Sequence, residues 1–175
     1  MGTERHRDWF LTLWLVAAAA LAGCGEKWET TEFPEAGFTA TFPMPVMSQP
    51  KDGGILRHWA HVGDVQLQVV RSPVPEGATL STGAEEILRN LYQEIRSGGN
   101  AREESPPRMG QFQGRYPTIE FHLSGNTSDG KDRNTKGRMI LVGDHIFIAT
   151  ALWRSGDKKG PLHADRFLDS FKITQ

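Results

Sequence analysis

The chain has 175 residues but only one cysteine, Cys24, so no disulfide can form within it. It also has no long run of lysine or arginine, and its formal net charge is only −1. Proteins that bind nucleic acids concentrate positive charge on one face, so we expect no nucleic-acid partner. The apolar and charged fractions are those of a globular protein, whose stability must come from packing rather than from disulfides.

Sequence motifs for catalysis are equally scarce. The chain has no Walker A loop and no dinucleotide-binding fingerprint. Leu123-Ser124-Gly125 lacks the first glycine of the G-x-S-x-G turn that presents a nucleophilic serine. The sequence therefore predicts a protein that is not an enzyme, with no catalytic residues and no cofactor.

The strongest positive signal lies at the N-terminus. Arg5 and Arg7 precede residues 9–23, a run of fifteen residues without a charge. As a helix this run would be about 22 Å long, which is short for a hydrocarbon core of about 30 Å. A cationic start followed by a short apolar run is typical of a secretory signal peptide. A short membrane anchor or a buried helix is the alternative.

The end of the apolar run indicates the type of signal. Leu21-Ala22-Gly23-Cys24 resembles the lipobox of bacterial lipoproteins. The small residues before the cysteine give a peptidase access to the backbone, and only a thiol can form a thioether. The resemblance implies a signal peptide over residues 1–23, a diacylglyceryl thioether on Cys24 and a further acyl chain, such as palmitate, on its new amino group. An ordinary signal peptide followed by a free thiol is the alternative.

Lipidation of Cys24 would make a membrane the first partner of the mature chain, because two acyl chains anchor a protein stably. Removal of 23 of the 175 residues leaves 152, the length of one domain. The resemblance implies a place in the cell envelope, facing the periplasm, and Gly25 in place of an aspartate slightly favours the outer membrane. We interpret residues 24–36 as the lipidated cysteine and a polar tether, with Trp28 near the lipid headgroups, and residues 37–175 as a single domain.

The remaining sequence alternates between strand and turn signals. Gly63-Asp64 and Gly143-Asp144 predict tight hairpins, Pro106-Pro107 indicates a linker, and residues 124–134 indicate a loop or a long hairpin tip. Both faces of residues 146–153 are largely apolar, so a strand here should be central in its sheet. Period-two alternation predicts strands over residues 38–42, 55–62, 65–69, 116–123, 138–142 and 145–153.

Two helices complete the pattern. Thr82 and Glu85 form a capping box, and apolar residues at helical spacing continue to Ile95, shortly before Gly98-Gly99. A shorter last helix covers about residues 162–170. Hairpins with helices between and after them predict an α+β fold, in which helices pack on an antiparallel sheet of about six strands.

Three segments resemble a known family when they are taken in order. They are GFTATFP at residues 37–43, GRYPTIEF at residues 114–121 and RFLDSFKI at residues 166–173. This order resembles small bacterial lipoproteins with a PsbP-like domain, named after a subunit of the photosynthetic oxygen-evolving complex. The resemblance implies an α/β/α sandwich over most of residues 37–173 and, by analogy, a role in binding partners. It transfers no functional residue to this chain.

Glu120 and His122 are the candidates for chemistry. Their spacing places both side chains on one face of a strand, where they could act as an acid/base pair or as half of a metal site. The alternative is a solvated sheet face, because catalytic pairs need burial to tune their pKa values. His58 and His61 are three residues apart, so on a strand they point to opposite faces and cannot chelate a metal together.

The leading functional hypothesis is a lipid-anchored, non-enzymatic module of the cell envelope that binds a protein partner or assists assembly. One alternative is a metal-dependent or acid/base enzyme that uses Glu120 and His122. The other is a lipoprotein that binds a small ligand between sheet and helix, which would require a concave pocket.

Overall fold

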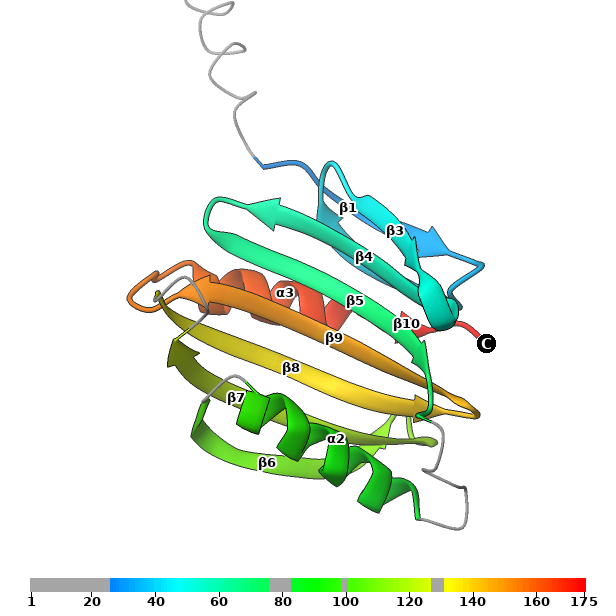
Figure 1. Ribbon diagram of the computed structural model, residues 1–175. Coiled ribbons are helices and arrows are strands. Elements are labelled where there is room, and N and C mark those ends of the chain that lie inside the picture. Colours follow the sequence, from blue (N-terminus) through cyan, green and yellow to red (C-terminus); the bar gives the residue numbers. More distant parts are fainter. Residues whose placement is uncertain (1–25, 76–82, 99–100, 127–130) are drawn as a thin grey trace, which may run out of the picture.

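The computed structural model describes residues 26–75, 83–98, 101–126 and 131–175. The predicted signal peptide, Cys24, Thr82 and Gly99 lie outside these residues. Within the described ranges the chain forms two α-helices and ten strands, which make one seven-stranded and one three-stranded sheet (Figure 1). The predicted fold class, an α+β fold with an antiparallel sheet, is confirmed. The predicted number of about six strands in one sheet is too low.

The small sheet pairs the start of the described chain with its end. Its strands are β1 (Trp28–Phe33), β2 (Phe38–Pro43) and β10 (Lys172–Ile173), with β2 in the middle and both neighbours antiparallel to it. Residues 28–33 are therefore part of the domain, and their interpretation as a tether is wrong. The residues of β1 alternate between half-buried and exposed, but the strand is too polar to be separated from a linker by composition.

The large sheet is antiparallel throughout, in the order β3-β4-β5-β9-β8-β7-β6. A short 3-10 helix, η1 (Asp52–Gly54), connects its first two strands. The strands are β3 (Met47–Lys51), β4 (Ile55–Val62), β5 (Val65–Pro73), β6 (Arg102–Phe112), β7 (Tyr116–Asn126), β8 (Asp132–Val142) and β9 (His145–Arg154).

The predicted hairpins form where glycine permits a positive φ. Gly63 and Gly143 have φ of 55° and 59°, and they connect β4 to β5 and β8 to β9. The prediction that β9 is central is also confirmed, because it is the fourth of the seven strands. The hairpin tip predicted over residues 124–134 is shorter than expected, since β7 continues to Asn126 and β8 begins at Asp132.

Pro106 and Pro107 do not form a linker. They lie inside β6, the edge strand of the large sheet, where the pairing with β7 shifts register between Ser105 and Arg108. Proline lacks an amide proton, so it is tolerated at an edge or a bulge but not in a central strand. The same residues that break a central strand thus protect this edge from further pairing.

The two helices lie on opposite faces of the large sheet (Figure 1). The helix α2 (Ala84–Gly98) packs on β7 and β8, and it contributes Ile87, Leu88 and Tyr92 to the hydrophobic core between helix and sheet. On the other face, α3 (Gly160–Ser170) packs on β9 and β5 together with the small sheet, with Phe38 and Phe167 in the core. The large sheet thus has a hydrophobic core on each face, one under α2 and one between the sheet, α3 and the small sheet.

Candidate functional site

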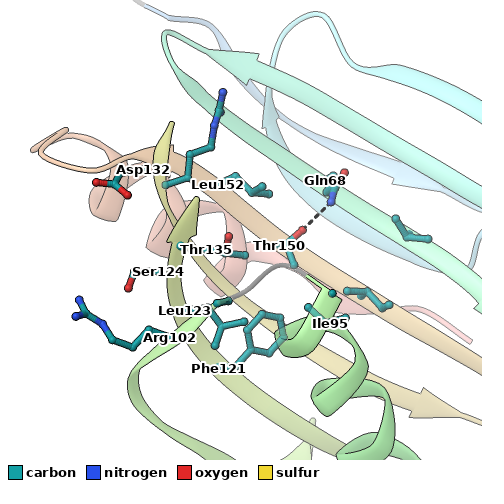
Figure 2. Close-up of a pocket in the computed structure, with 16 residues that line it drawn as sticks. Gln68, Ile95, Arg102, Phe121, Leu123, Ser124, Asp132, Thr135, Thr150 and Leu152 are labelled. Carbon is teal, nitrogen blue, oxygen red and sulfur yellow. Dashed lines mark hydrogen bonds between the residues drawn. The ribbon is translucent and has the colours of Figure 1, made fainter. Parts of the chain in front are cut away.

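The large sheet is only partly covered on the face that carries α2. Among the described elements, α2 alone packs on this face, over β7 and β8. Beside it lies a groove of about 1170 Å³, which we call the open groove (Figure 2). Its floor comes from β5 and β9, with Gln68, Val70, Ile148, Thr150 and Leu152, and α2 contributes Ile95 to its wall.

A row of polar side chains crosses the floor of the open groove from strand to strand. The Arg57 Nε donates to Gln68 Oε1 at 3.1 Å, and Gln68 Nε2 donates to Thr150 Oγ1 at 3.0 Å. Gln66 Nε2 also donates to Gln68 Oε1, at 3.2 Å. The Arg57 guanidinium lies 4.8 Å from the centre of the Trp59 ring, an attractive cation–π geometry. Each partner fixes the next, so the row is held in one geometry before anything binds.

Aliphatic side chains accompany this polar row. Val70 on β5 pairs with Ile148 on β9, and both are half-buried, as is Leu152. Ile95 on α2 is 36% exposed although it follows the apolar spacing of the helix. Half-exposed aliphatic groups beside ordered amides and hydroxyls are typical of surfaces that bind other molecules.

The residues of the open groove can bind but have little chemistry. Its described lining includes amides, hydroxyls and aliphatic groups, with Arg102, Asp132 and Arg133 at one end. Among its described lining residues, Asp132 carries a carboxylate and Ser124, Thr135 and Thr150 carry hydroxyls, but none is histidine, cysteine, lysine or tyrosine. The sequence does not predict this site, because its one signal, Gln66 and Gln68 on the polar face of β5, is shared with any solvated strand.

Glu120 and His122 lie on the opposite face of the sheet, in a smaller hollow of about 450 Å³. They are neighbours on one face of β7, as the alternation predicts, but each has its own structural partner. Glu120 Oε1 is 3.0 Å from Arg138 Nη2, and the His122 ring lies 5.7 Å from the Trp153 ring between centroids. Glu120 is thus committed to an ion pair rather than placed against His122.

The pKa of the His122 imidazole is lowered in this hollow. Burial lowers the pKa of its imidazole below 6.5, and the nearby Glu104 carboxylate opposes the shift. Its Nε2 is buried without a hydrogen-bond partner among the described residues. Lys136 Nζ, on the neighbouring strand, is 2.5 Å from Asp165 Oδ1 of α3. The hollow therefore contains two ion pairs. One joins Glu120 to Arg138 within the sheet, and the other joins Lys136 to Asp165 of α3.

A metal centre finds no support in the described residues. They contain no group of three or more histidine, cysteine, aspartate or glutamate side chains that could hold a metal ion. His58 and His61 face opposite sides of β4, as expected: the His58 ring packs 4.3 Å from Phe33, whereas His61 is exposed. His145 forms a hydrogen bond of 2.5 Å with Asp144 in the turn between β8 and β9.

Trp28 occupies a place that the sequence does not predict. Instead of lying in a free tether, its ring stacks on His163 of α3, with the ring centroids 5.5 Å apart. The Arg166 guanidinium lies 4.4 Å from the centre of the same ring. The start of the described chain is therefore attached to α3.

Among the described residues, no helix is both long and apolar enough to span a bilayer.

Comparison with known proteins identifies the fold and nothing finer. No protein family model and no curated protein matches the sequence. The structure is similar to cyanobacterial PsbP (CyanoP) from Synechocystis sp. PCC 6803, with a TM-score of 0.59 and 14% identity over 86% of this chain and 95% of that one. The chain therefore has a PsbP-like α+β fold, as the sequence resemblance implies.

Two more distant similarities were found. PA94, a protein of unknown function from Pseudomonas aeruginosa, has a TM-score of 0.47 and 14% identity, over 78% of this chain and 88% of that one. LpqN of Mycobacterium tuberculosis, which is involved in cell envelope biogenesis, has a TM-score of 0.41 and 14% identity, over 86% of this chain and 80% of that one.

Proposed function

We propose that this chain is a lipid-anchored, non-enzymatic module of the bacterial cell envelope that binds a protein partner in the open groove. The observation that carries the proposal is the uncovered part of the large sheet, where an ordered polar row lies beside half-exposed Val70, Ile148 and Leu152. The anchor rests on the lipobox-like sequence that ends at Cys24. The PsbP-like proteins that the sequence resembles act mostly by binding partners, which supports the proposal by analogy only.

The shape of the open groove favours a protein over a small molecule. Pockets for small ligands usually enclose about 300–1,000 Å³ and surround most of the ligand. The open groove is larger, at about 1170 Å³, and its floor is the face of an exposed sheet. Amide and hydroxyl groups beside aliphatic side chains match an uncharged polypeptide segment, which offers both backbone hydrogen bonds and apolar side chains.

Photo-crosslinking in intact envelopes tests the proposed binding surface. A photoreactive residue at the position of Val70 should form a discrete adduct with one protein, whereas the same residue at Gln111, exposed on the edge strand β6, should not. Leu152→Glu should reduce the Val70 adduct by placing a charge in the groove. The control Arg89→Glu, at an exposed residue of α2 that does not line the groove, should leave the adduct intact.

Two outcomes would contradict the proposal in different ways. A Val70 adduct with a small molecule would favour the alternative of a ligand-binding lipoprotein. Equal adducts from Val70 and Gln111 would mean that the groove has no special role. Mass spectrometry of the purified native protein tests the anchor separately: Cys24 should be the first residue and should carry acyl chains, and an unmodified thiol or an intact leader would exclude lipid anchoring.

A further inference from the structure

The start of the described chain is fixed to the domain by several independent contacts. Trp28 stacks on His163 and lies beneath Arg166. One residue earlier, the carbonyl of Lys27 accepts a hydrogen bond of 2.9 Å from the Met44 amide. Ordered structure thus begins no later than Lys27, because backbone pairing and side-chain packing both hold it there.

The distance from this fixed point to the proposed anchor is short. Three peptide units separate Cys24 from Lys27, and a fully extended chain advances at most about 3.6 Å per residue. The Cα atom of Cys24 therefore lies within about 11 Å of the Cα atom of Lys27. A domain of this size has a radius of gyration of about 15 Å, so such a link is too short to let the domain turn freely above a membrane.

The surface around this point has the composition of a membrane interface. Leu162 on the first turn of α3 is 69% exposed, the largest exposure among the big apolar side chains described. It is four residues from Arg166, on the same side of the helix, and Lys158 and Lys159 are exposed just before α3. An exposed leucine, a half-buried tryptophan and long basic side chains together suit the boundary between lipid headgroups and acyl chains, and the carboxylate of Glu26 beside them lies 3.8 Å from His163 Nε2.

We infer that the N-terminal end of α3, together with Trp28, rests against the bilayer that holds the acyl chains of Cys24. The inference depends on the proposed lipid anchor and adds the orientation of the domain on it. Because α2 lies on the opposite face of the large sheet (Figure 1), the open groove beside α2 then points away from the lipid and stays accessible to a partner. The surface that would contact lipid includes Trp28, Lys158, Lys159, Leu162 and Arg166.

Fluorescence quenching in reconstituted vesicles tests this orientation. Native protein is purified with its acyl chains, which mass spectrometry verifies first, and is reconstituted into phosphatidylethanolamine–phosphatidylglycerol vesicles that contain a headgroup-labelled nitroxide lipid. Acylation uses the only natural thiol, so one introduced cysteine can be labelled alone. A fluorophore at Leu162→Cys should be quenched several-fold more strongly than one at Arg89→Cys, which is exposed on α2.

A second pair of variants tests the part played by Trp28. Trp28→Ala should weaken quenching at position 162, because the surface proposed to contact lipid loses its aromatic ring, while the backbone contacts of Lys27 keep the link short. Trp59→Ala removes a tryptophan from the other face of the large sheet and should leave quenching unchanged. Equal quenching at positions 162 and 89 in fully acylated protein would overturn the orientation while leaving the proposed function intact. Protein without acyl chains would overturn both.

Discussion

Gly137 on β8 lies directly opposite Thr150 on β9, and a Cβ atom added to Gly137 would be 2.7 Å from the Thr150 methyl group. The same Cβ atom would be 2.8 Å from the Ala149 carbonyl oxygen and 2.8 Å from Phe121 Cζ. Thr150 in turn holds Gln68 in the polar row of the open groove, through a hydrogen bond of 3.0 Å. Because Gly137 has no side chain, β8 and β9 can pack closely here, next to Phe121 in the core under α2 and to the floor of the open groove.

Gly137→Ala should destabilise the fold. A methyl group at this position collides with a backbone oxygen, which cannot rotate away, so strands β8 and β9 must shift. Overpacking of this kind costs about 1–3 kcal/mol, which a urea titration would show as a lower midpoint. Gly83→Ala is the matched control, because nothing lies within 4 Å of its added Cβ atom. An unchanged midpoint for Gly137→Ala would mean that the two strands are further apart than described.

Trp28→Ala should also lower the free energy of unfolding. The substitution removes a stacked ring contact with His163 and a cation–π contact with Arg166. Contacts of these two kinds contribute about 0.5–1.5 and 0.5–1 kcal/mol, so a loss of about 1–3 kcal/mol is expected when the lost apolar contact is included. Lys27→Ala, at the preceding exposed residue, should change stability by less than about 0.5 kcal/mol. Equal stability of the two variants would indicate that β1 is only loosely attached.

The sequence predicts those elements whose signals are local. Gly63-Asp64 and Gly143-Asp144 each specify a hairpin, and the alternation on either side sets the strands. The helix that begins at Ala84 is predicted by apolar spacing together with a capping box and a glycine stop, and the last helix by apolar spacing. Glu120 and His122 are correctly placed on one strand face, because alternation is a property of every strand.

The remaining features depend on partners far away in the sequence. The strand β1 is defined by its pairing with β2 and by the position of Trp28 on α3, which is more than 130 residues later in the chain. The exposed edge strand β3 has no buried residue, so it has no hydrophobic pattern to detect. The open groove exists because α2 covers only part of this sheet face and leaves β5, β9 and one end of β7 and β8 uncovered, a consequence of helix placement rather than of any motif.

Stability should decrease between pH 7 and pH 5 because of two half-buried histidines. Burial lowers the pKa of His58 and of His122 below the ordinary value of 6.5. In the unfolded chain both imidazoles take up protons as the pH falls through about 6.5. The folded chain resists this uptake, so the unfolded state binds more protons and the free energy of unfolding falls as the pH is lowered. The neutral rings make their full contribution to the free energy of unfolding above pH 6.5, and this contribution is lost as the pH falls below that value.

The double variant His58→Gln, His122→Gln should flatten this dependence, as measured by urea titrations at half-unit intervals of pH. His61→Gln removes an exposed histidine from the same strand as His58 and serves as the control. Glu104 and Asp144 titrate below this window, because hydrogen bonds to Ser124 and His145 lower their pKa values below 4.5 and 3.8. A parent protein with constant stability from pH 7 to pH 5 would contradict the burial of the two rings.

At alkaline pH, Tyr92 should resist ionisation. Burial, reinforced by the hydrogen bond from its hydroxyl to Glu103 Oε1 at 2.8 Å, raises its pKa to about 12. An ultraviolet titration of the folded protein should show a phenolate step near this pH that Tyr92→Phe removes. A group whose folded pKa is raised stabilises the fold at low pH and loses that effect as the pH rises, here between about 10 and 12.

The same hydrogen bond should be measurable at neutral pH. Tyr92→Phe removes a donor to an ionised carboxylate, a bond that contributes about 1.5–3 kcal/mol. Glu103 Oε1 keeps a second partner, Arg96 Nη1 at 3.0 Å, so the carboxylate is not left unpaired and the loss should fall at the lower end of that range. The difference between parent and variant should shrink above pH 10, as Tyr92 approaches ionisation. A difference that stays constant to pH 12 would mean that the Tyr92 hydroxyl does not bond to Glu103.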